Sequence, residues 1–133
     1  MASILIVEDE PTIRNILLFL LEEERHMCRA VASAEEALAL LSAGAFDLVM
    51  TDMSLPKMSG AELLRRIRQY YPKIPVIMVS GRSDYLTGKE VLELGAYAFI
   101  AKPYALATIA DCVSQAIDQA NTAPKKKAAV QAA

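Results

Sequence analysis

The fold is indicated most clearly by the stretch Phe46-Asp47-Leu48-Val49-Met50-Thr51-Asp52, which is apolar almost throughout and ends in an aspartate. A short, nearly continuous apolar run is typical of a strand covered on both faces, as in a parallel sheet. Because parallel strands end at one edge of their sheet, the polar residues that follow them are expected to meet there. Three further apolar runs end in this way: 4–7 before Glu8-Asp9, 74–79 before Ser80, and 97–101 before Lys102-Pro103.

Helical periodicity fills the segments between these strands. Residues 27–31 add a short, weaker strand pattern, and Ser33 with Glu36 and Ser59 with Glu62 form capping-box patterns at two helix starts. Five strands that alternate with five helices predict an α/β protein, a three-layer α/β/α sandwich around a parallel sheet. The helices are expected at 12–24, 33–43, 59–72, 83–94 and 105–120.

Composition predicts one folded domain with a short tail. The chain has 133 residues, of which 54% are hydrophobic and only 23% charged, so it can bury a core. Composition changes after residue 121, and residues 122–133, rich in Lys and Ala, are expected to be a disordered tail.

Charge and hydropathy argue against two classes of partner. A net charge of −2 predicts no direct nucleic acid binding and no attraction to anionic membranes. No apolar run approaches the roughly 20 residues that span a bilayer, and the first residues do not resemble a signal peptide. We therefore expect a cytoplasmic protein.

The cysteines and the histidine do not form a recognisable site. Cys28 and Cys112 are too few and too far apart to predict a metal site or a disulfide framework, so we expect two small buried side chains. His26 is the only histidine and has no triad pattern around it, so we expect it at the surface.

The strand-end residues have a shared chemistry. Three close carboxylates, those of Glu8, Asp9 and Asp52, repel one another, so either one takes up a proton or a cation neutralises them. A hard divalent cation such as Mg²⁺ suits an all-oxygen site and is the stronger interpretation. The Lys102 ammonium and the Ser80 hydroxyl suit a phosphoryl group. A carboxylate can attack phosphorus and form an aspartyl phosphate, and Asp52 is the natural nucleophile because it ends a central strand.

Each of these residues also has a purely structural interpretation. Turns are polar, so strand ends often carry Asp, Ser or Lys, and the segment Glu8-Asp9-Glu10-Pro11 could simply place negative charge at a helix start. Agreement among four strand ends favours a site. Asp47 lies at a strand entrance, away from that edge, and is expected to be a turn residue.

At these residues the chain resembles the receiver domain of two-component response regulators, of the chemotaxis-regulator type. The resemblance implies a flavodoxin-like (βα)5 receiver domain over residues 1–121, with a five-stranded parallel sheet of order 2-1-3-4-5. It also implies a cis peptide between Lys102 and Pro103. It is carried by Glu8-Asp9, Asp52-Met53-Ser54-Leu55-Pro56-Lys57-Met58-Ser59-Gly60, Ser80, Gly95-Ala96 and Lys102-Pro103.

The resemblance implies a phosphoacceptor and a metal site. Asp52 would accept a phosphoryl group from a phosphohistidine on a histidine kinase or phosphotransfer protein. Glu8 and Asp9 would hold Mg²⁺ together with Asp52 and the main-chain carbonyl of Ser54. Glu8 stands where the family more often has Asp.

It also implies a switch. Ser80 and Lys102 would contact the phosphoryl oxygens, and Phe99 occupies the aromatic switch position. As Ser80 moves toward the phosphoryl group, Phe99 would turn inward and remodel the face made by the fourth helix, fifth strand and fifth helix. We expect a downstream protein target to dock there, through Phe99 and Tyr104, on a monomer or weak dimer.

Several alternatives remain open. The chain is expected to be a signalling phosphoacceptor and not an enzyme. It is expected to be a free-standing regulator because it starts at Met1. A phosphorelay intermediate or a truncated receiver of a multidomain regulator fits the same residues. A phosphorylation-independent binding module would be expected to lose acidic or lysine members of the site. A phosphohydrolase with an aspartate nucleophile usually has a second acid where this chain has Ser54. A flavodoxin-like cofactor binder is disfavoured because Glu8-Asp9-Glu10 would repel a cofactor phosphate.

Overall fold

A single parallel sheet forms the centre of the computed structural model, which describes residues 2–81, 86–121 and 128–131. Within these residues the strand order is β2-β1-β3-β4-β5-β6, and every pairing is parallel. The strands are β1 (Ser3–Val7), β2 (Met27–Val31), β3 (Leu48–Asp52), β4 (Val76–Ser80), β5 (Ala98–Ala101) and β6 (Ala128–Gln131). The helices are α1 (Pro11–Glu23), α2 (Ala34–Ala43), α3 (Gly60–Tyr70), α4 (Gly88–Glu93) and α5 (Leu106–Asn121).

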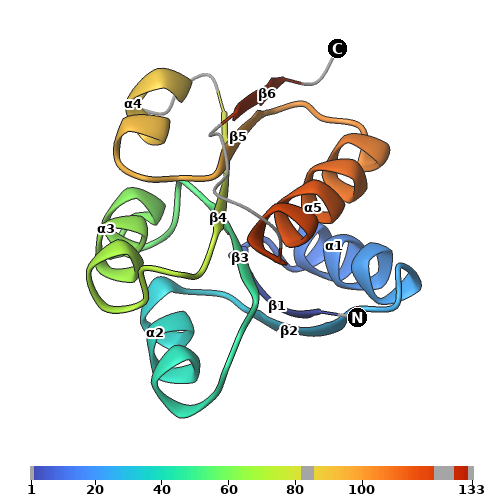
Figure 1. The fold of residues 1–133 in the computed structure, drawn as a ribbon, viewed down its shortest axis with the longest axis horizontal. Coiled ribbons are helices and arrows are strands. Elements are labelled where there is room, and N and C mark those ends of the chain that lie inside the picture. The colour runs from blue at the N-terminus through green and yellow to red at the C-terminus, as the bar shows by residue number, and fades with distance from the viewer. Residues whose placement is uncertain (1, 82–85, 122–127, 132–133) are drawn as a thin grey trace.

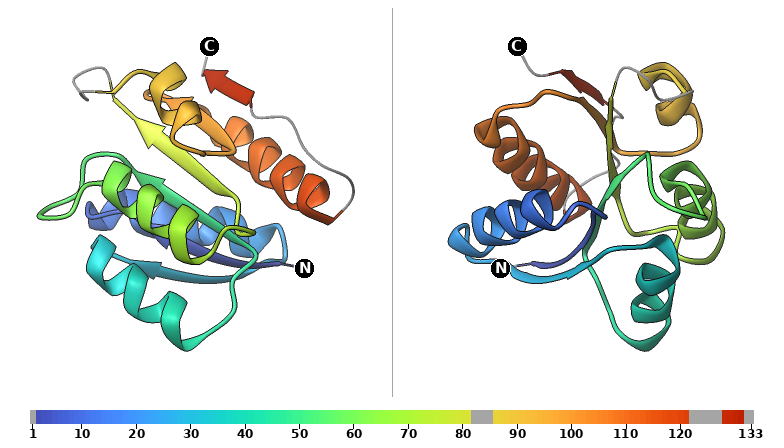
Figure 2. Two further views of the ribbon diagram at one scale, coloured as in Figure 1. Left: turned by 60° about the vertical axis from the view of Figure 1, so that its left-hand side comes forward. Right: turned by 180° about the vertical axis from the view of Figure 1, so that it is seen from behind.

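The sheet separates two hydrophobic cores. Figures 1 and 2 show α1 and α5 on one face of the sheet and α2, α3 and α4 on the other. Side chains alternate between the faces along each strand, so Ile4 and Ile6 pack beneath α1 and α5, whereas Leu5 and Val7 pack beneath the other three helices. The predicted three-layer α/β/α sandwich and the order 2-1-3-4-5 are confirmed.

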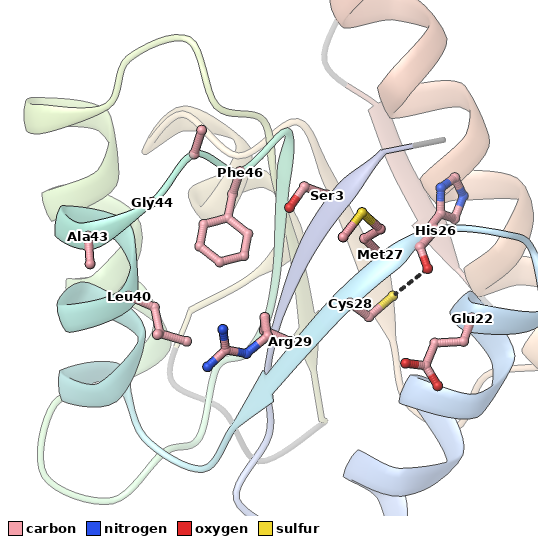
Figure 3. Close-up of a pocket in the computed structure, with 11 residues that line it drawn as sticks. Ser3, Glu22, His26, Met27, Cys28, Arg29, Leu40, Ala43, Gly44 and Phe46 are labelled. Carbon is pink, nitrogen blue, oxygen red and sulfur yellow. Dashed lines mark hydrogen bonds between the residues drawn. The ribbon is translucent and has the colours of Figure 1, made fainter.

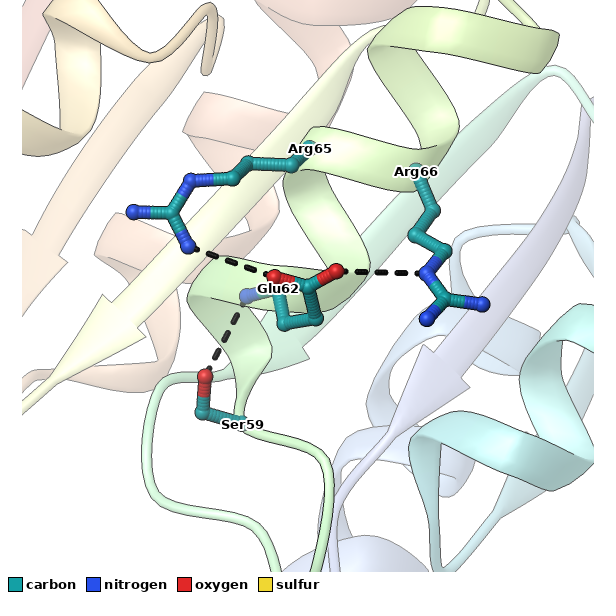
Figure 4. A network of polar contacts seen from close by, with 4 residues as sticks. All are labelled: Ser59, Glu62, Arg65 and Arg66. Carbon is teal, nitrogen blue, oxygen red and sulfur yellow. Dashed lines mark hydrogen bonds and ion pairs between the residues drawn. The ribbon is translucent and has the colours of Figure 1, made fainter.

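Polar caps fix the starts of α2 and α3, as the sequence predicts. The Ser33 hydroxyl accepts a hydrogen bond from the Glu36 N–H at 3.1 Å, and the Ser59 hydroxyl accepts one from the Glu62 N–H at 3.2 Å. At α3 the Glu62 carboxylate turns toward the solvent and pairs with Arg65 and Arg66, as Figure 4 shows. These exposed ion pairs contribute little to stability, so the cap itself positions the start of α3.

Helix α4 is shorter than the sequence predicts. The periodicity predicts a helix over 83–94, but α4 begins at Gly88 and residues 82–85 lie outside the described residues. Thr87 is the N-cap, and its hydroxyl and N–H exchange hydrogen bonds with the backbone and side chain of Glu90 at 3.1 and 2.8 Å. This reciprocal cap satisfies the first turn and sets the boundary.

The structure differs from the expected disordered tail at residues 128–131. These four residues form β6, which pairs with β5 in the register Ala98↔Ala128 to Ala101↔Gln131. The rest of that segment, 122–127 and 132–133, lies outside the described residues. Alanine has low strand propensity, and a ladder against the open edge of β5 outweighs that local preference.

At the base of the sheet, Arg68 joins two chain reversals. Its Nη2 donates hydrogen bonds to the carbonyls of Tyr71 and Ile74, between α3 and β4. Its aliphatic part lies against Gly95, between α4 and β5, where φ is +110° and an added Cβ would meet the Arg68 side chain. Burial lowers the pKa of the Arg68 guanidinium, which nonetheless stays charged. The base of the sheet is thus held by one side chain that contacts two turns.

Candidate functional site

The structure brings the predicted residues together at the carboxyl edge of the sheet. Glu8 directly follows β1, Asp52 ends β3, Ser80 ends β4 and Lys102 directly follows β5. The strands are in parallel register, with Asp52 opposite Val79 and Ser80 opposite Ala101. The parallel arrangement of the strands therefore brings four residues that are distant in sequence to one edge of the sheet.

An acidic triad lies at the centre of this edge. Glu8, Asp9 and Asp52 each offer a carboxylate oxygen, and the three oxygens lie within 4.8 Å of one another. Glu8 and Asp52 are only 3% and 5% exposed, whereas Asp9 is exposed. Burial, together with the charges of Asp52 and Asp9, raises the pKa of Glu8, although the N–H of Glu10 donates to its carboxylate at 3.1 Å. Burial and mutual repulsion therefore disfavour the state in which all three carboxylates of the triad are ionised.

Lys102 provides the opposing positive charge. Its Nζ lies 3.0 Å from Oδ1 of Asp52. Burial alone would lower the pKa of Lys102, but the hydrogen bond to Asp52 and the charges of Asp52 and Glu8 outweigh it and raise that pKa. The Lys102 N–H also donates to the Ser80 carbonyl at 2.8 Å, which fixes the backbone of the lysine beside the end of β4. The peptide between Lys102 and Pro103 is cis, as predicted.

The donor set fits a hard divalent cation. Three carboxylate oxygens this close suit Mg²⁺, which typically takes one or two carboxylates and keeps several waters. Despite its extra methylene, Glu8 reaches the cluster, so its replacement of the commoner Asp preserves the acidic set. The raised pKa of Glu8 adds a physical reason, because a bound cation would favour the ionised form that burial disfavours.

Mg²⁺ affinity is expected to fall as the pH is lowered through a range that begins above the ordinary pKa of a glutamate. A proton on Glu8 competes with the cation, and the raised pKa of Glu8 moves this competition to higher pH. Below that pKa the affinity falls by about tenfold per pH unit. Calorimetric titrations between pH 5 and 7.5 measure the effect in wild type and Glu8→Gln. The glutamine variant should bind more weakly at pH 7.5 and with a shallower pH dependence; equal pH dependence would contradict the role of Glu8.

Gly60 lets the backbone of α3 approach the acceptor strand. Its N–H donates to the Met53 carbonyl at 2.8 Å. A Cβ at residue 60 would lie 2.8 Å from the Met53 Cα and would overlap the Asp52 carbonyl. The start of α3 therefore packs directly on the backbone that positions Asp52, and only glycine leaves space for it.

Ser80 and Phe99 are buried residues of the neighbouring strands β4 and β5. Ser80 is 2% exposed and its Oγ donates to the Gly81 carbonyl at 3.3 Å. Phe99 is 8% exposed and packs beneath the α4 side of the sheet. A Cβ at Gly88 would lie 2.7 Å from the Phe99 ring, so the ring lies directly against the first residue of α4. A movement of the Phe99 ring would therefore change its packing against the start of α4.

The two aromatic residues that the sequence analysis assigns to one docking face pack in different hydrophobic cores. Tyr104 packs against the core beneath α1 and α5, whereas Phe99 belongs to the core on the opposite side of the sheet. Burial raises the pKa of Tyr104, and so does the charge of Glu8, whereas Lys102 opposes the shift. Tyr104 thus borders the acidic site, a role that no sequence pattern indicated.

Arg14 is a second residue that the sequence did not single out. Its Nη1 donates to the main-chain carbonyls of Glu8 at 3.0 Å and Asp9 at 3.4 Å. The first turns of α1 thereby hold the loop that carries the acidic pair. The contact between Arg14 and the loop depends on how α1 packs beside that loop, which the sequence does not show. A basic residue five positions after Asp9 is only a weak sequence signal for it.

A pocket of about 630 Å³ lies at the other end of the sheet, beside the edge of β2 (Figure 3). His26 is half-buried there, and its Nδ1 accepts a hydrogen bond from the Ala2 N–H at 3.2 Å.

Burial and the nearby charge of Glu22 raise the pKa of the Cys28 thiol to about 11, and burial raises the pKa of the Cys112 thiol to about 11. Both thiols are thus poor nucleophiles at neutral pH. Cys112 is buried, as predicted, whereas Cys28 is only partly buried, contrary to the prediction.

No helix within the described part of the chain is both long and apolar enough to cross a membrane.

Asp47, the predicted turn residue, is exposed and accepts a hydrogen bond from the Ser3 N–H at 2.8 Å, away from the acidic triad.

Comparison with known proteins gives a consistent result. The sequence model of the response regulator receiver domain matches residues 4–114. The chain is 37% identical over 113 residues to the response regulator protein PilR of Pseudomonas aeruginosa, covering 85% of this chain and 25% of PilR. It is 30% identical over 125 residues to the DNA-binding transcriptional regulator NtrC of Rhizobium meliloti, covering 94% of this chain and 26% of NtrC. The chain thus spans about a quarter of the length of these two relatives.

Solved structures agree with this match. The fold is similar to a crystal structure of a response regulator receiver domain protein from Clostridium thermocellum, with a TM-score of 0.84 and 30% sequence identity. That likeness covers 90% of this chain and 96% of the other.

Proposed function

Because this chain belongs to the family of response regulator receiver domains, we propose that it accepts a phosphoryl group on Asp52 from a histidine kinase or phosphotransfer protein. The observation that carries the proposal is the contact of Lys102 with Asp52 inside the acidic triad. A buried carboxylate with a cation-binding set on one side and an ammonium on the other has the charge arrangement that phosphoryl transfer requires.

In the proposed reaction an oxygen of Asp52 attacks phosphorus while the bond from phosphorus to the donor's histidine nitrogen breaks. The electron pair of that bond leaves with the nitrogen, and an acyl phosphate forms on Asp52. Glu8 and Asp9 would hold Mg²⁺ with Asp52 and the Ser54 carbonyl, and the ion would supply charge neutralisation at the phosphoryl oxygens. Lys102 orients the carboxylate beforehand and then contacts the phosphoryl group, as does the Ser80 hydroxyl.

An apolar groove beside the site supports docking of a donor protein. Ile16 and Phe19 on α1 and Leu106 on α5 are 44%, 67% and 45% exposed, and they line a groove of about 470 Å³. Leu106, on one side of the groove, follows Lys102 by four residues in the chain. A helix of the donor with an apolar face suits such a groove.

The signal would leave through the face formed by α4, β5 and α5. Phe99 lies on β5 against Gly88 of α4, so a rearrangement of Ser80 and Phe99 around the phosphoryl group alters the start of α4. A downstream protein target would read this change. The chain is thereby proposed to be a phosphoacceptor signalling domain that works in the cytoplasm as a monomer or weak dimer.

The proposal is tested with a small acyl phosphate donor in place of the unidentified kinase. Intact-mass measurement of the wild-type chain with donor and Mg²⁺ should show one phosphoryl adduct, and a chelator should prevent it. The adduct should be lost on treatment with hydroxylamine, since acyl phosphates are labile to this nucleophile. A stable adduct, or labelling that is unaffected by the chelator, would contradict the assignment.

A further inference from the structure

The edge of β5 is covered by a segment of the same chain. An edge strand presents unpaired N–H and C=O groups, which form a template for another strand. Residues 128–131 pair with this edge in parallel, and Figure 1 shows β6 beside β5 at the end of the sheet. Phe99 is the register partner of Ala129, so β6 pairs with the strand that carries the proposed switch residue.

The covered edge lies within the proposed docking face. Strand β6 contacts α4 as well as β5, and Figure 1 shows it beside β5 at the top of the view, with α4 on its left and α5 on its right. A protein that docks on α4, β5 and α5 would therefore meet β6 first. The segment occupies backbone positions that an extended peptide of a partner would need.

The sequence of the segment suits a weak, replaceable strand. Ala128-Ala129-Val130-Gln131 carries no charge, and alanine is depleted in strands because it offers little side chain to pack. Four residues form a short ladder, so the pairing depends on few main-chain hydrogen bonds. A partner segment rich in β-branched residues would form a better strand at the same edge.

We propose that the β5 edge is a strand-docking surface, that the chain's own residues 128–131 occupy it in the resting protein, and that a partner must displace them to bind. The displacement step rests on the proposed function, because it assumes that the output partner uses this face. The pairing itself requires no phosphoryl group.

Amide hydrogen exchange in the full chain tests the pairing. We expect the β5 amides that face away from β4 to be protected in wild type. Proline has no N–H and is tolerated in edge strands only where no ladder bond is lost. Adjacent residues of a strand direct their N–H groups to opposite sides, so at least one of Ala129→Pro and Val130→Pro should remove a bond to β5. In that variant the protected β5 amides should exchange at least ~10-fold faster.

Ala129→Val is the matched control. It keeps the N–H and raises strand propensity, so protection of β5 should be equal to or greater than that in wild type. Amides of β1 and β3 should be unchanged in all variants, which reports that the rest of the sheet is intact. The pairing is contradicted if these β5 amides are unprotected in wild type, or if neither proline variant changes them.

A synthetic peptide with the sequence of residues 125–133 tests the competition. Labelled peptide, followed by fluorescence anisotropy, should bind the open proline variant at least ~10-fold more tightly than wild type. Equal affinities of the peptide for the proline variant and for wild type would contradict the proposal that residues 128–131 cover the β5 edge. Protection that falls on dilution of the wild-type chain would assign the occupant to a second copy and overturn the intramolecular assignment. None of these measurements uses Asp52, so failure of phosphoryl labelling would be a separate result.

Discussion

Replacing Asp52 by asparagine is expected to abolish the phosphoryl adduct that forms with a small acyl phosphate donor. The amide is uncharged and its oxygen is a poor nucleophile toward phosphorus. The change also removes the ion pair with Lys102 at 3.0 Å and one carboxylate of the triad. Loss of nucleophile and charge together should reduce labelling by about 1,000-fold or more, which intact-mass measurement over time can follow.

Asp47→Asn is the control for this experiment. Asp47 ends no strand, is exposed, and its Oδ2 accepts a hydrogen bond from the Ser3 N–H that an amide oxygen can also accept. The control should label at the wild-type rate. An adduct of equal size in Asp52→Asn would place the acceptor elsewhere.

The same variant has a readout that needs no donor. The charge of Asp52 contributes to the raised pKa values of Glu8 and Lys102. In Asp52→Asn both pKa values should therefore fall, which nuclear magnetic resonance titrations can measure. Unchanged values would mean that Asp52 does not interact with these groups in solution.

Gly60→Val is expected to give the largest loss of stability among single substitutions near the site. A Cβ at this position would overlap the Asp52 carbonyl and lie 2.8 Å from the Met53 Cα. Either β3 or the start of α3 must move, because both neighbours are backbone atoms. We expect the free energy of unfolding to fall by about 3 kcal/mol, as measured by urea denaturation, with slower labelling of Asp52 in the fraction that stays folded.

Gly44→Ala is the matched control. An added Cβ there would meet only the Leu40 carbonyl, at the ordinary distance of 3.8 Å. Its free energy of unfolding should stay within about 0.5 kcal/mol of wild type. If Gly60→Val were as stable as Gly44→Ala, the close approach of α3 to β3 would not hold in solution.

The buried elements were predictable because their signal is local. The stretch 46–52 is mostly apolar, so it indicates a central parallel strand, and Asp52 falls at the carboxyl edge because it ends that strand. The capping serines, Ser33 and Ser59, are equally local, since each cap joins residues three positions apart. The positions of the strand ends were sufficient to place the acidic triad.

The missed features depend on contacts between distant segments. Ala128 and Ala129 have weak strand propensity, and only the open edge of β5 explains β6. Tyr104 follows a proline turn, so no periodicity indicates which side of the sheet it joins. Gly60 belongs to the stretch that carries the family resemblance, but its close contact with the backbone of Asp52 exists only after α3 packs on β3.

The contacts of Arg68 at the base of the sheet bear on how strands β4 and β5 can move. Its guanidinium binds the turn that leads into β4, and its aliphatic part packs on Gly95, which precedes β5. The amino ends of the two strands are therefore fixed relative to each other. Displacement of one strand against the other should grow along their length and be greatest at Ser80 and Lys102, so that the two strands pivot about their common base.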